Sequence, residues 1–222
     1  PEESLFLMRH TFSSLVQWAL FAGDSFLRRL LDQGTLPVYE YLRSLLQALE
    51  WQGAGGRWVL KTGQHLLDLD VIAEAFPDAG FVWTHRDPAE LVSSFLSIAT
   101  CFRKGTQAPP VDLPQLAENC LDMIDAALRR GMQSQVVRRG ERILHVPYTR
   151  LVADPIGTAT AVCERFGLPL DDDDRAQMRA WMSANPQDRW GRHRYGLGPF
   201  GLDAGDVSRR YAEYTSRFIA GD

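Results

Sequence analysis

Residues 81–90 read FVWTHRDPAE and join two kinds of element within one short stretch. The first four residues form an apolar run that is too short for a helix. The remainder is a strong helix start, because Asp87 can cap the first turn, Pro88 suits the first helical position and Glu90 stands three residues after the cap. A buried strand that leads directly into a helix is typical of an α/β protein.

Two further short apolar runs flank this stretch in the chain, WVL at residues 58–60 and ILHV at residues 143–146. The segments between the three runs are too long for hairpins and long enough for helices, which indicates parallel strands. We therefore predict an α/β fold in which a parallel β-sheet is flanked by helices on both faces.

Helices account for most of the remaining sequence. Apolar residues recur at three- and four-residue steps over much of residues 1–51 and over residues 65–75, 88–102, 116–138, 155–167, 172–182 and 205–218. Residues 103–114 and the arginine- and glycine-rich residues 185–202 lack this period, so we predict loops there. A loop as long as the second is uncommon in a compact domain unless it serves a function.

The charge and cysteine content exclude several classes of protein. A formal net charge of -4 argues against bulk nucleic acid or an anionic membrane surface as the partner. The three cysteines, Cys101, Cys120 and Cys163, are far apart and lack the spacing of metal ligands, so we expect free thiols and no metal. No apolar stretch reaches the roughly 18 residues that a membrane span needs, so we expect a cytoplasmic protein without such a span.

Polar side chains follow two of the predicted strands. Lys61 and His65 come after residues 58–60, and His85 and Arg86 come at the end of residues 81–84. Because the carboxyl ends of parallel strands meet at one edge of a sheet, we expect these side chains to share a rim. A histidine can take a proton from a hydroxyl, and a lysine can stabilise charge on a leaving phosphate. A surface lysine and a structural histidine remain the alternatives.

Arg86 also stands just before a predicted helix, whose first N–H groups attract anions. Ser94 lies about two turns further along that helix, so both side chains could meet at one bound oxyanion. The alternative is that residues 87–90 only cap the helix and that Arg86 is a solvated charge.

Three segments in this order closely resemble the bacterial branch of the sulfotransferases that depend on 3'-phosphoadenosine 5'-phosphosulfate (PAPS). They are RWVLKTGQHL at residues 57–66, FPDA at residues 76–79 and THRDP at residues 84–88. The resemblance extends to residues 1–3, 9–14 and 200–203 and so covers nearly the whole chain. It implies the P-loop-like sulfotransferase fold, a sulfuryl donor (PAPS), the product 3'-phosphoadenosine 5'-phosphate (PAP), a hydroxyl acceptor and no metal.

The resemblance also implies roles for individual residues. Lys61 matches the lysine near the transferred sulfuryl group, and His65 is the candidate general base. His65 departs from the cytosolic animal members, in which the histidine stands two residues after the lysine rather than four. The cofactor-binding candidates are Arg86 and Ser94 at the 3'-phosphate, Tyr148 near the adenine, and Arg192 and Arg194 in the loop that covers the cofactor.

One element of the family pattern is absent from this sequence. The family begins with a strand and a loop rich in glycine, serine and threonine that cradles the 5'-phosphosulfate, and no such segment occurs here. The chain also begins with Pro1 and not with Met. We therefore expect residues 1–222 to be the larger, C-terminal part of a single sulfotransferase domain, and to bind PAPS poorly without the preceding part.

Two other functions stay open at this point. A small-molecule kinase would need a phosphate-binding lysine loop and carboxylates for magnesium, and neither is visible. A non-catalytic module of the same fold would bind PAP without transferring a sulfuryl group. The sequence does not specify whether the acceptor is a small molecule, a lipid or a carbohydrate, and it leaves homo-oligomerisation open.

Overall fold

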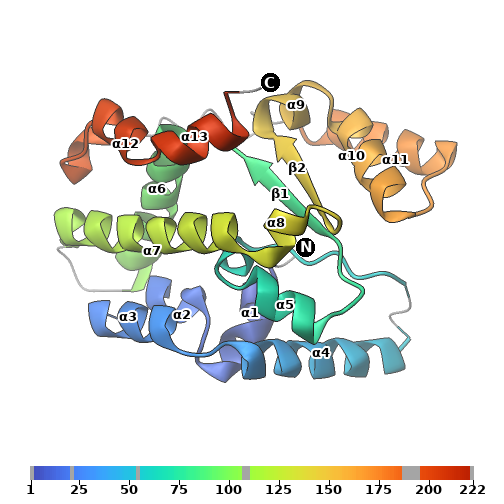
Figure 1. Cartoon of the computed structure of the whole chain (residues 1–222), viewed down its shortest axis with the longest axis horizontal. Coiled ribbons are helices and arrows are strands. Elements are labelled where there is room, and N and C mark those ends of the chain that lie inside the picture. The colour runs from blue at the N-terminus through green and yellow to red at the C-terminus, as the bar shows by residue number, and fades with distance from the viewer. Residues whose placement is uncertain (1–2, 21–22, 54–55, 107–110, 187–195, 221–222) are drawn as a thin grey trace.

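The structure of the protein is a computed structural model, which describes residues 3–20, 23–53, 56–106, 111–186 and 196–220. Helices dominate this described part of the chain, and two strands in it form a small sheet between them (Figure 1). The α-helices are α1 (Ser4–Met8), α2 (Leu15–Leu20), α3 (Asp24–Asp32), α4 (Leu36–Trp51), α5 (Leu69–Ala75), α6 (Pro88–Thr106), α7 (Leu113–Gln133), α8 (Gln135–Arg139), α9 (Tyr148–Ala153), α10 (Pro155–Phe166), α11 (Asp172–Ala184), α12 (Ala204–Arg210) and α13 (Ala212–Phe218). The described residues also form short 3-10 helices, namely η1 (Arg9–Thr11), η2 (Gly63–Leu67) and η3 (Gly198–Phe200).

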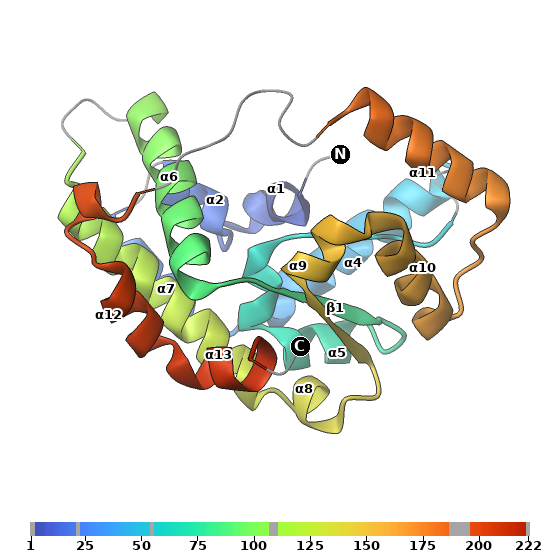
Figure 2. The ribbon, with the colours of Figure 1, turned by 90° about the horizontal axis from the view of Figure 1, so that it is seen from above.

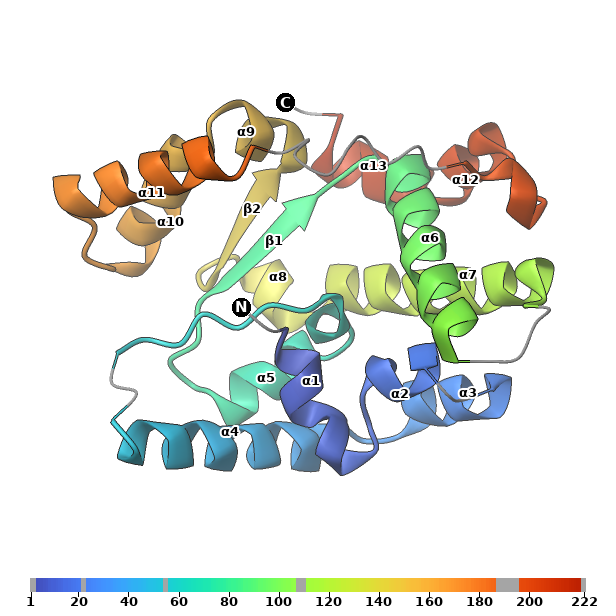
Figure 3. The ribbon, with the colours of Figure 1, turned by 180° about the vertical axis from the view of Figure 1, so that it is seen from behind.

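The sheet consists of β1 (Phe81–His85) and β2 (Ile143–Pro147), which pair in parallel with Phe81 opposite Ile143 and His85 opposite Pro147. This confirms two of the three predicted strands and their relative direction. Both strands point the same way, and α6 and α9 begin from their carboxyl ends (Figure 3). The residues just after the two strands therefore lie at one edge of the sheet.

The predicted strand at residues 58–60 is wrong. Residues 57–62 form neither helix nor strand, and β2 is the only strand paired with β1 in the described part of the chain. Val59 is 87% exposed, and the Trp58 ring N–H donates to the Glu50 carboxylate at 2.7 Å. The run is apolar enough for a strand, but no described neighbour supplies the ladder of hydrogen bonds that a strand needs.

Several predicted helices are divided by polar residues or end elsewhere. The helix expected over residues 116–138 ends at Gln133, because the Ser134 hydroxyl accepts from the Val136 N–H and donates to Asp70 at 2.6 Å. The helix expected over residues 65–75 is η2 followed by α5, and the one expected over residues 205–218 is divided at Tyr211. The helix from Pro88 continues one turn beyond its predicted end, and α9 was not predicted.

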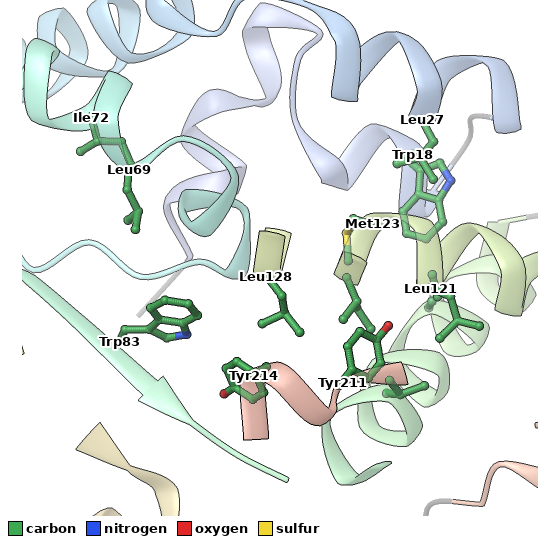
Figure 4. Close-up of a cluster of buried hydrophobic side chains, with 14 of the residues drawn as sticks. Trp18, Leu27, Leu69, Ile72, Trp83, Leu121, Met123, Leu128, Tyr211 and Tyr214 are labelled. Atoms are coloured by element: carbon green, nitrogen blue, oxygen red, sulfur yellow. The ribbon is translucent and has the colours of Figure 1, made fainter. Parts of the chain in front are cut away.

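The core lies around α7, which contributes buried residues along most of its length. Burial of a large apolar side chain contributes about 1.5–3 kcal/mol, so this helix anchors the elements on either side of it. Figure 4 shows part of this core, with Trp18, Leu27, Leu69, Ile72, Trp83, Leu121, Met123, Leu128, Tyr211 and Tyr214 labelled.

Helix α13 packs against the sheet through a group of aromatic rings. The His85 ring stacks on Phe218 with 4.6 Å between centroids, and its Nδ1 lies 3.1 Å from the Tyr214 hydroxyl. The Nε2 of His85 lies 2.8 Å from Nδ1 of His145 on β2. Burial lowers the pKa of His85 to about 3, so the ring is neutral at pH 7. These contacts fit the structural alternative for His85, and they fix the carboxyl end of β1, which Arg86 directly follows.

The helices lie on different sides of the two strands. Helices α9, α10 and α11 lie together on one side, while α7, α12 and α13 lie on the other (Figure 2). On β1 the side chains of Phe81, Trp83 and His85 are buried, whereas Val82 is 44% exposed. The strand therefore presents one face to the core.

Candidate functional site

Arg86 and Tyr148 meet at the carboxyl edge of the sheet. Each follows its strand directly, and the register places His85 opposite Pro147, so the next residues are neighbours. The Arg86 guanidinium carbon lies 4.7 Å from the centre of the Tyr148 ring. This cation–π contact holds the guanidinium at the edge of the sheet, where only 28% of the Arg86 side chain is exposed.

The guanidinium of Arg86 keeps most of its hydrogen-bonding capacity for a ligand. Its Nε donates to the Glu90 carboxylate at 2.9 Å, one helical turn further on. In the described part of the chain, its two terminal amino groups donate no hydrogen bond. An oxyanion could therefore bind at these two groups, in competition with the nearby Glu90 carboxylate, which is 59% exposed.

Ser94 continues the same face of α6. Residues four apart on a helix are displaced by about 40° around its axis, so Glu90 and Ser94 lie on a single side of α6. Arg86 precedes the helix and reaches this side through its bond to Glu90. The Ser94 side chain is half-buried and has no hydrogen-bond partner among the described residues. Its neighbour Ser93 is buried and donates to the Glu90 carbonyl at 3.1 Å, so of these two serines Ser94 is the one whose hydroxyl is not already bonded within the described residues.

The start of α6 is capped as the sequence predicts. Asp87 accepts from the backbone N–H of Glu90 at 3.1 Å. Residues 87–90 therefore do cap the helix, which is the first half of the alternative to an anion site. This capping does not account for Arg86, whose side chain is held on Tyr148 rather than fully solvated.

Lys61 and His65 lie together beside the N-terminal segment. The Lys61 side chain is 75% exposed, and its ammonium group forms an ion pair with Glu3. Its backbone carbonyl accepts from the Ser4 N–H at 3.2 Å. No hydrogen bond, ion pair or ring contact in the described part of the chain joins Lys61 or His65 to Arg86. The single rim expected for all these side chains is thus observed as two groups.

His65 belongs to a buried chain of hydrogen bonds. Its Nε2 lies 2.9 Å from the Ser4 hydroxyl and its Nδ1 lies 3.2 Å from the Tyr39 hydroxyl. Tyr39 donates to Asp68 at 3.2 Å, and Thr35 donates to the other carboxylate oxygen at 2.9 Å. Burial lowers the pKa of His65 to about 4 and raises the pKa of Asp68.

Sequence reasoning missed the other members of this hydrogen-bond chain. Ser4 is on α1, Tyr39 is on α4 and Asp68 lies between η2 and α5. No spacing in the sequence connects three elements that approach one another only after folding. The one available signal was the position of Asp68 three residues after His65.

Gln64 fixes the segment that carries Lys61 and His65. Its side chain is 2% exposed, accepts from the Leu15 N–H at 2.9 Å and donates to the Ser13 carbonyl at 3.0 Å. These two bonds hold the turn at Phe12, whose backbone is left-handed with φ 53° and whose side chain is 70% exposed. The Lys61 segment and the first helices therefore form one unit.

Two cavities lie away from Arg86 and Lys61. One, of about 490 Å³, is lined by α7 and the C-terminal helices, including Arg129 and Arg217. The other, of about 360 Å³, is lined by residues that include Thr35 and Asp68, so the far end of the His65 hydrogen-bond chain borders it.

The two remaining cofactor-binding candidates, Arg192 and Arg194, lie outside the described residues. Among the residues that the structure does describe, no group of three His, Cys, Asp or Glu side chains could hold a metal ion. The described helices include none that is both long enough and apolar enough to cross a membrane.

Comparisons with known proteins agree with one another. A family model described as the sulfotransferase family matches residues 1–172. Sulfotransferase STF9 from Mycobacterium avium superposes with a TM-score of 0.88 at 26% identity, over 99% of this chain and 56% of that one. Sulfotransferase STF1 from Mycobacterium tuberculosis H37Rv gives a TM-score of 0.81 at 30% identity, over 96% of this chain and 55% of that one. The chain thus spans just over half the length of both. No curated protein sequence matches.

Proposed function

Because the chain belongs to the sulfotransferase family, we propose that it takes part in moving a sulfuryl group from PAPS to a hydroxyl acceptor. The acceptor is a small molecule, a lipid or a carbohydrate, and PAP is the nucleotide product. The single observation that supports this most strongly is the placement of the Arg86 guanidinium on Tyr148 at the carboxyl edge of the sheet.

The proposed 3'-phosphate site is built from Arg86 and Ser94. A ribose phosphate carries two negative charges, and a guanidinium with free terminal N–H groups binds such an anion through charge-assisted hydrogen bonds. The Ser94 hydroxyl lies two turns along the same face of α6 and supplies a further donor. Tyr148 orients the guanidinium and offers an aromatic surface to the adenine. Arg192 and Arg194 would close over the bound nucleotide.

Lys61 and His65 are the proposed catalytic residues. In the transfer, the acceptor oxygen attacks sulfur while the bond between sulfur and the phosphate oxygen breaks, and the electron pair of that bond stays on PAP. The Lys61 ammonium stabilises the charge on the departing oxygen, and His65 receives the acceptor proton. Lys61 is exposed, and Glu3 is the one ion-pair partner of its side chain among the described residues, so this flexible side chain can turn towards a bound nucleotide.

A comparison of two nucleotides tests the proposal on the purified protein. PAP and AMP differ only in the 3'-phosphate, so the ratio of their dissociation constants isolates that group. We expect PAP to bind about 10 to 150 times more tightly than AMP, the equivalent of 1.5–3 kcal/mol for a hydrogen bond to a charged group. Equal affinities would contradict the proposal, and a preference for ATP with magnesium would favour a kinase.

A further inference from the structure

In the hydrogen-bond chain around His65, each bond can be assigned one donor and one acceptor. Resting on the proposed function, we infer that Tyr39 and Asp68 are positioning residues that hold His65 with its proton on Nδ1 and its Nε2 lone pair free to accept the proton of the sulfuryl acceptor.

The argument begins at Asp68, which is 6% exposed. Its two carboxylate oxygens receive the Thr35 hydroxyl at 2.9 Å and the Tyr39 hydroxyl at 3.2 Å. Burial raises the pKa of Asp68, whereas both hydrogen bonds and the nearby Arg130 favour the ionised carboxylate. An ionised carboxylate can only accept, so Thr35 and Tyr39 must be the donors.

Tyr39 then determines which ring nitrogen of His65 carries the proton. Its side chain is fully buried, and its pKa is raised well above 10 by burial and by Asp68, so the hydroxyl keeps its single proton. The hydroxyl donates that proton to the Asp68 carboxylate. The 3.2 Å contact between the Tyr39 oxygen and Nδ1 of His65 is therefore satisfied only if Nδ1 carries a hydrogen and donates it.

The other ring nitrogen follows by elimination. With its pKa lowered to about 4, His65 is neutral at pH 7 and carries one ring proton, which is on Nδ1. Nε2 is thus a bare acceptor, and it receives the Ser4 hydroxyl at 2.9 Å. The Lys61 carbonyl at 3.3 Å is a more distant acceptor for the same Ser4 proton. An alcohol therefore already donates to the nitrogen that we assign as the base.

This arrangement suits proton transfer from an acceptor hydroxyl. When the acceptor binds, its hydroxyl replaces Ser4 as the donor to Nε2, and its proton passes to Nε2 as its oxygen bonds to sulfur. The imidazolium that forms donates from Nδ1 to Tyr39, whose own proton is held by Asp68. The Asp68 charge thus stabilises the imidazolium through Tyr39, without touching the reacting atoms. In metal sites, removing the hydrogen-bond partner of a ligating histidine reduces metal affinity or activity by about 10- to 100-fold. We expect a loss of activity on the same scale when the partner of His65 is removed.

Nitrogen-15 NMR on histidine-labelled protein tests the inference without any activity measurement. The His65 signals are assigned by their loss in His65→Gln. We expect the Nδ1–H form in the wild type and a shift towards the Nε2–H form in Tyr39→Phe, which keeps the ring but removes the oxygen. A wild-type His65 in the Nε2–H form, or a tautomer unchanged by Tyr39→Phe, would overturn the inference.

Kinetics on the same variants give a second readout. Tyr39→Phe should lower kcat for sulfuryl transfer by about 10- to 100-fold while KM for PAPS stays within about twofold. Tyr41→Phe, on the exposed side of the same helix, is the control and should match the wild type in both constants. An unchanged kcat in Tyr39→Phe would contradict the inference, as would a fall in kcat that accompanies an equal loss of folded protein. If neither the wild type nor any variant binds PAP, that result would instead count against the proposed function. The NMR test of the His65 tautomer does not depend on PAP binding.

Discussion

The guanidinium of Arg86 lies over the ring of Tyr148, with 4.7 Å between its central carbon and the ring centre. The two residues are far apart in the chain and are brought together because each one directly follows a strand of the same parallel pair. The contact places a positive charge at the start of α6, at the edge of the sheet where α/β proteins bind anionic ligands.

Tyr148→Leu tests the contribution of this contact to nucleotide binding. Loss of a cation–π interaction of about 0.5–2 kcal/mol should weaken PAP binding by about 2- to 30-fold. Isothermal titration with PAP measures the change. Tyr41→Leu, at a tyrosine that is 37% exposed on α4, is the matched control and should leave the affinity unchanged. A Tyr148→Leu protein that binds PAP as the wild type does would show that the ring is dispensable.

Glu90→Gln should have the opposite effect. The Glu90 carboxylate accepts from Nε of Arg86, so a bound phosphate meets a like charge beside the guanidinium. Exposed ion pairs are worth about 0.2–1 kcal/mol, so removing this charge should tighten PAP binding by about 1.5- to 5-fold at low salt. Asp172→Asn, which breaks the exposed pair with Arg175, serves as the control. Weaker binding in Glu90→Gln would mean that Glu90 orients Arg86 for the ligand.

Gln64→Ala should destabilise the fold. The variant leaves the backbone N–H of Leu15 and the carbonyl of Ser13 without their partner in a buried position. Each unsatisfied group costs about 1–3 kcal/mol in the free energy of unfolding. Urea denaturation measures the loss, with Gln177→Ala on the exposed surface of α11 as the control. Equal stabilities of the two variants would refute the role assigned to Gln64.

The stability of the protein should fall as the pH is lowered from 7.5 to 5. Burial lowers the pKa of His65 to about 4 and that of His85 to about 3, whereas an unfolded histidine titrates near 6.5. Below pH 6.5 the unfolded chain therefore binds protons that the folded chain excludes, and the free energy of unfolding decreases. Urea midpoints across this pH range should drop, and the drop should be smaller in His85→Gln than in the control His10→Gln. An identical drop in both variants would contradict this assignment.

The sheet was predictable because its two strands are marked by short apolar runs followed by strong helix starts or polar residues. The same reasoning failed at residues 58–60, since an apolar run becomes a strand only where a neighbour completes its hydrogen bonds. The helix breaks at Ser134 and Asp68 also escaped prediction. They arise from side-chain hydrogen bonds, such as that between Ser134 and Asp70, which apolar periodicity does not record.

The candidate site was predictable only in part. Arg86 could be assigned to the edge of the sheet from strand order, whereas Tyr148 was suggested only by the family resemblance. Tyr39 and Ser4 could not be connected with His65, because they come from helices that precede it in the chain and meet it only in the folded core. The absence of contact between Lys61 and Arg86 in the described residues also differs from the prediction, because the segment before Lys61 is not a strand of the sheet.

The most direct test of the proposed phosphate site is a PAP titration of Arg86→Ala and Ser94→Ala beside two controls. Arg209→Ala removes an exposed arginine that pairs with its helical neighbour Asp206, and Ser97→Ala removes an exposed serine of α6. We predict that Arg86→Ala weakens PAP binding by about 10- to 150-fold and Ser94→Ala by about 2- to 10-fold, while both controls bind as the wild type does. Wild-type affinity in Arg86→Ala and Ser94→Ala would contradict the assignment of the 3'-phosphate to this edge of the sheet.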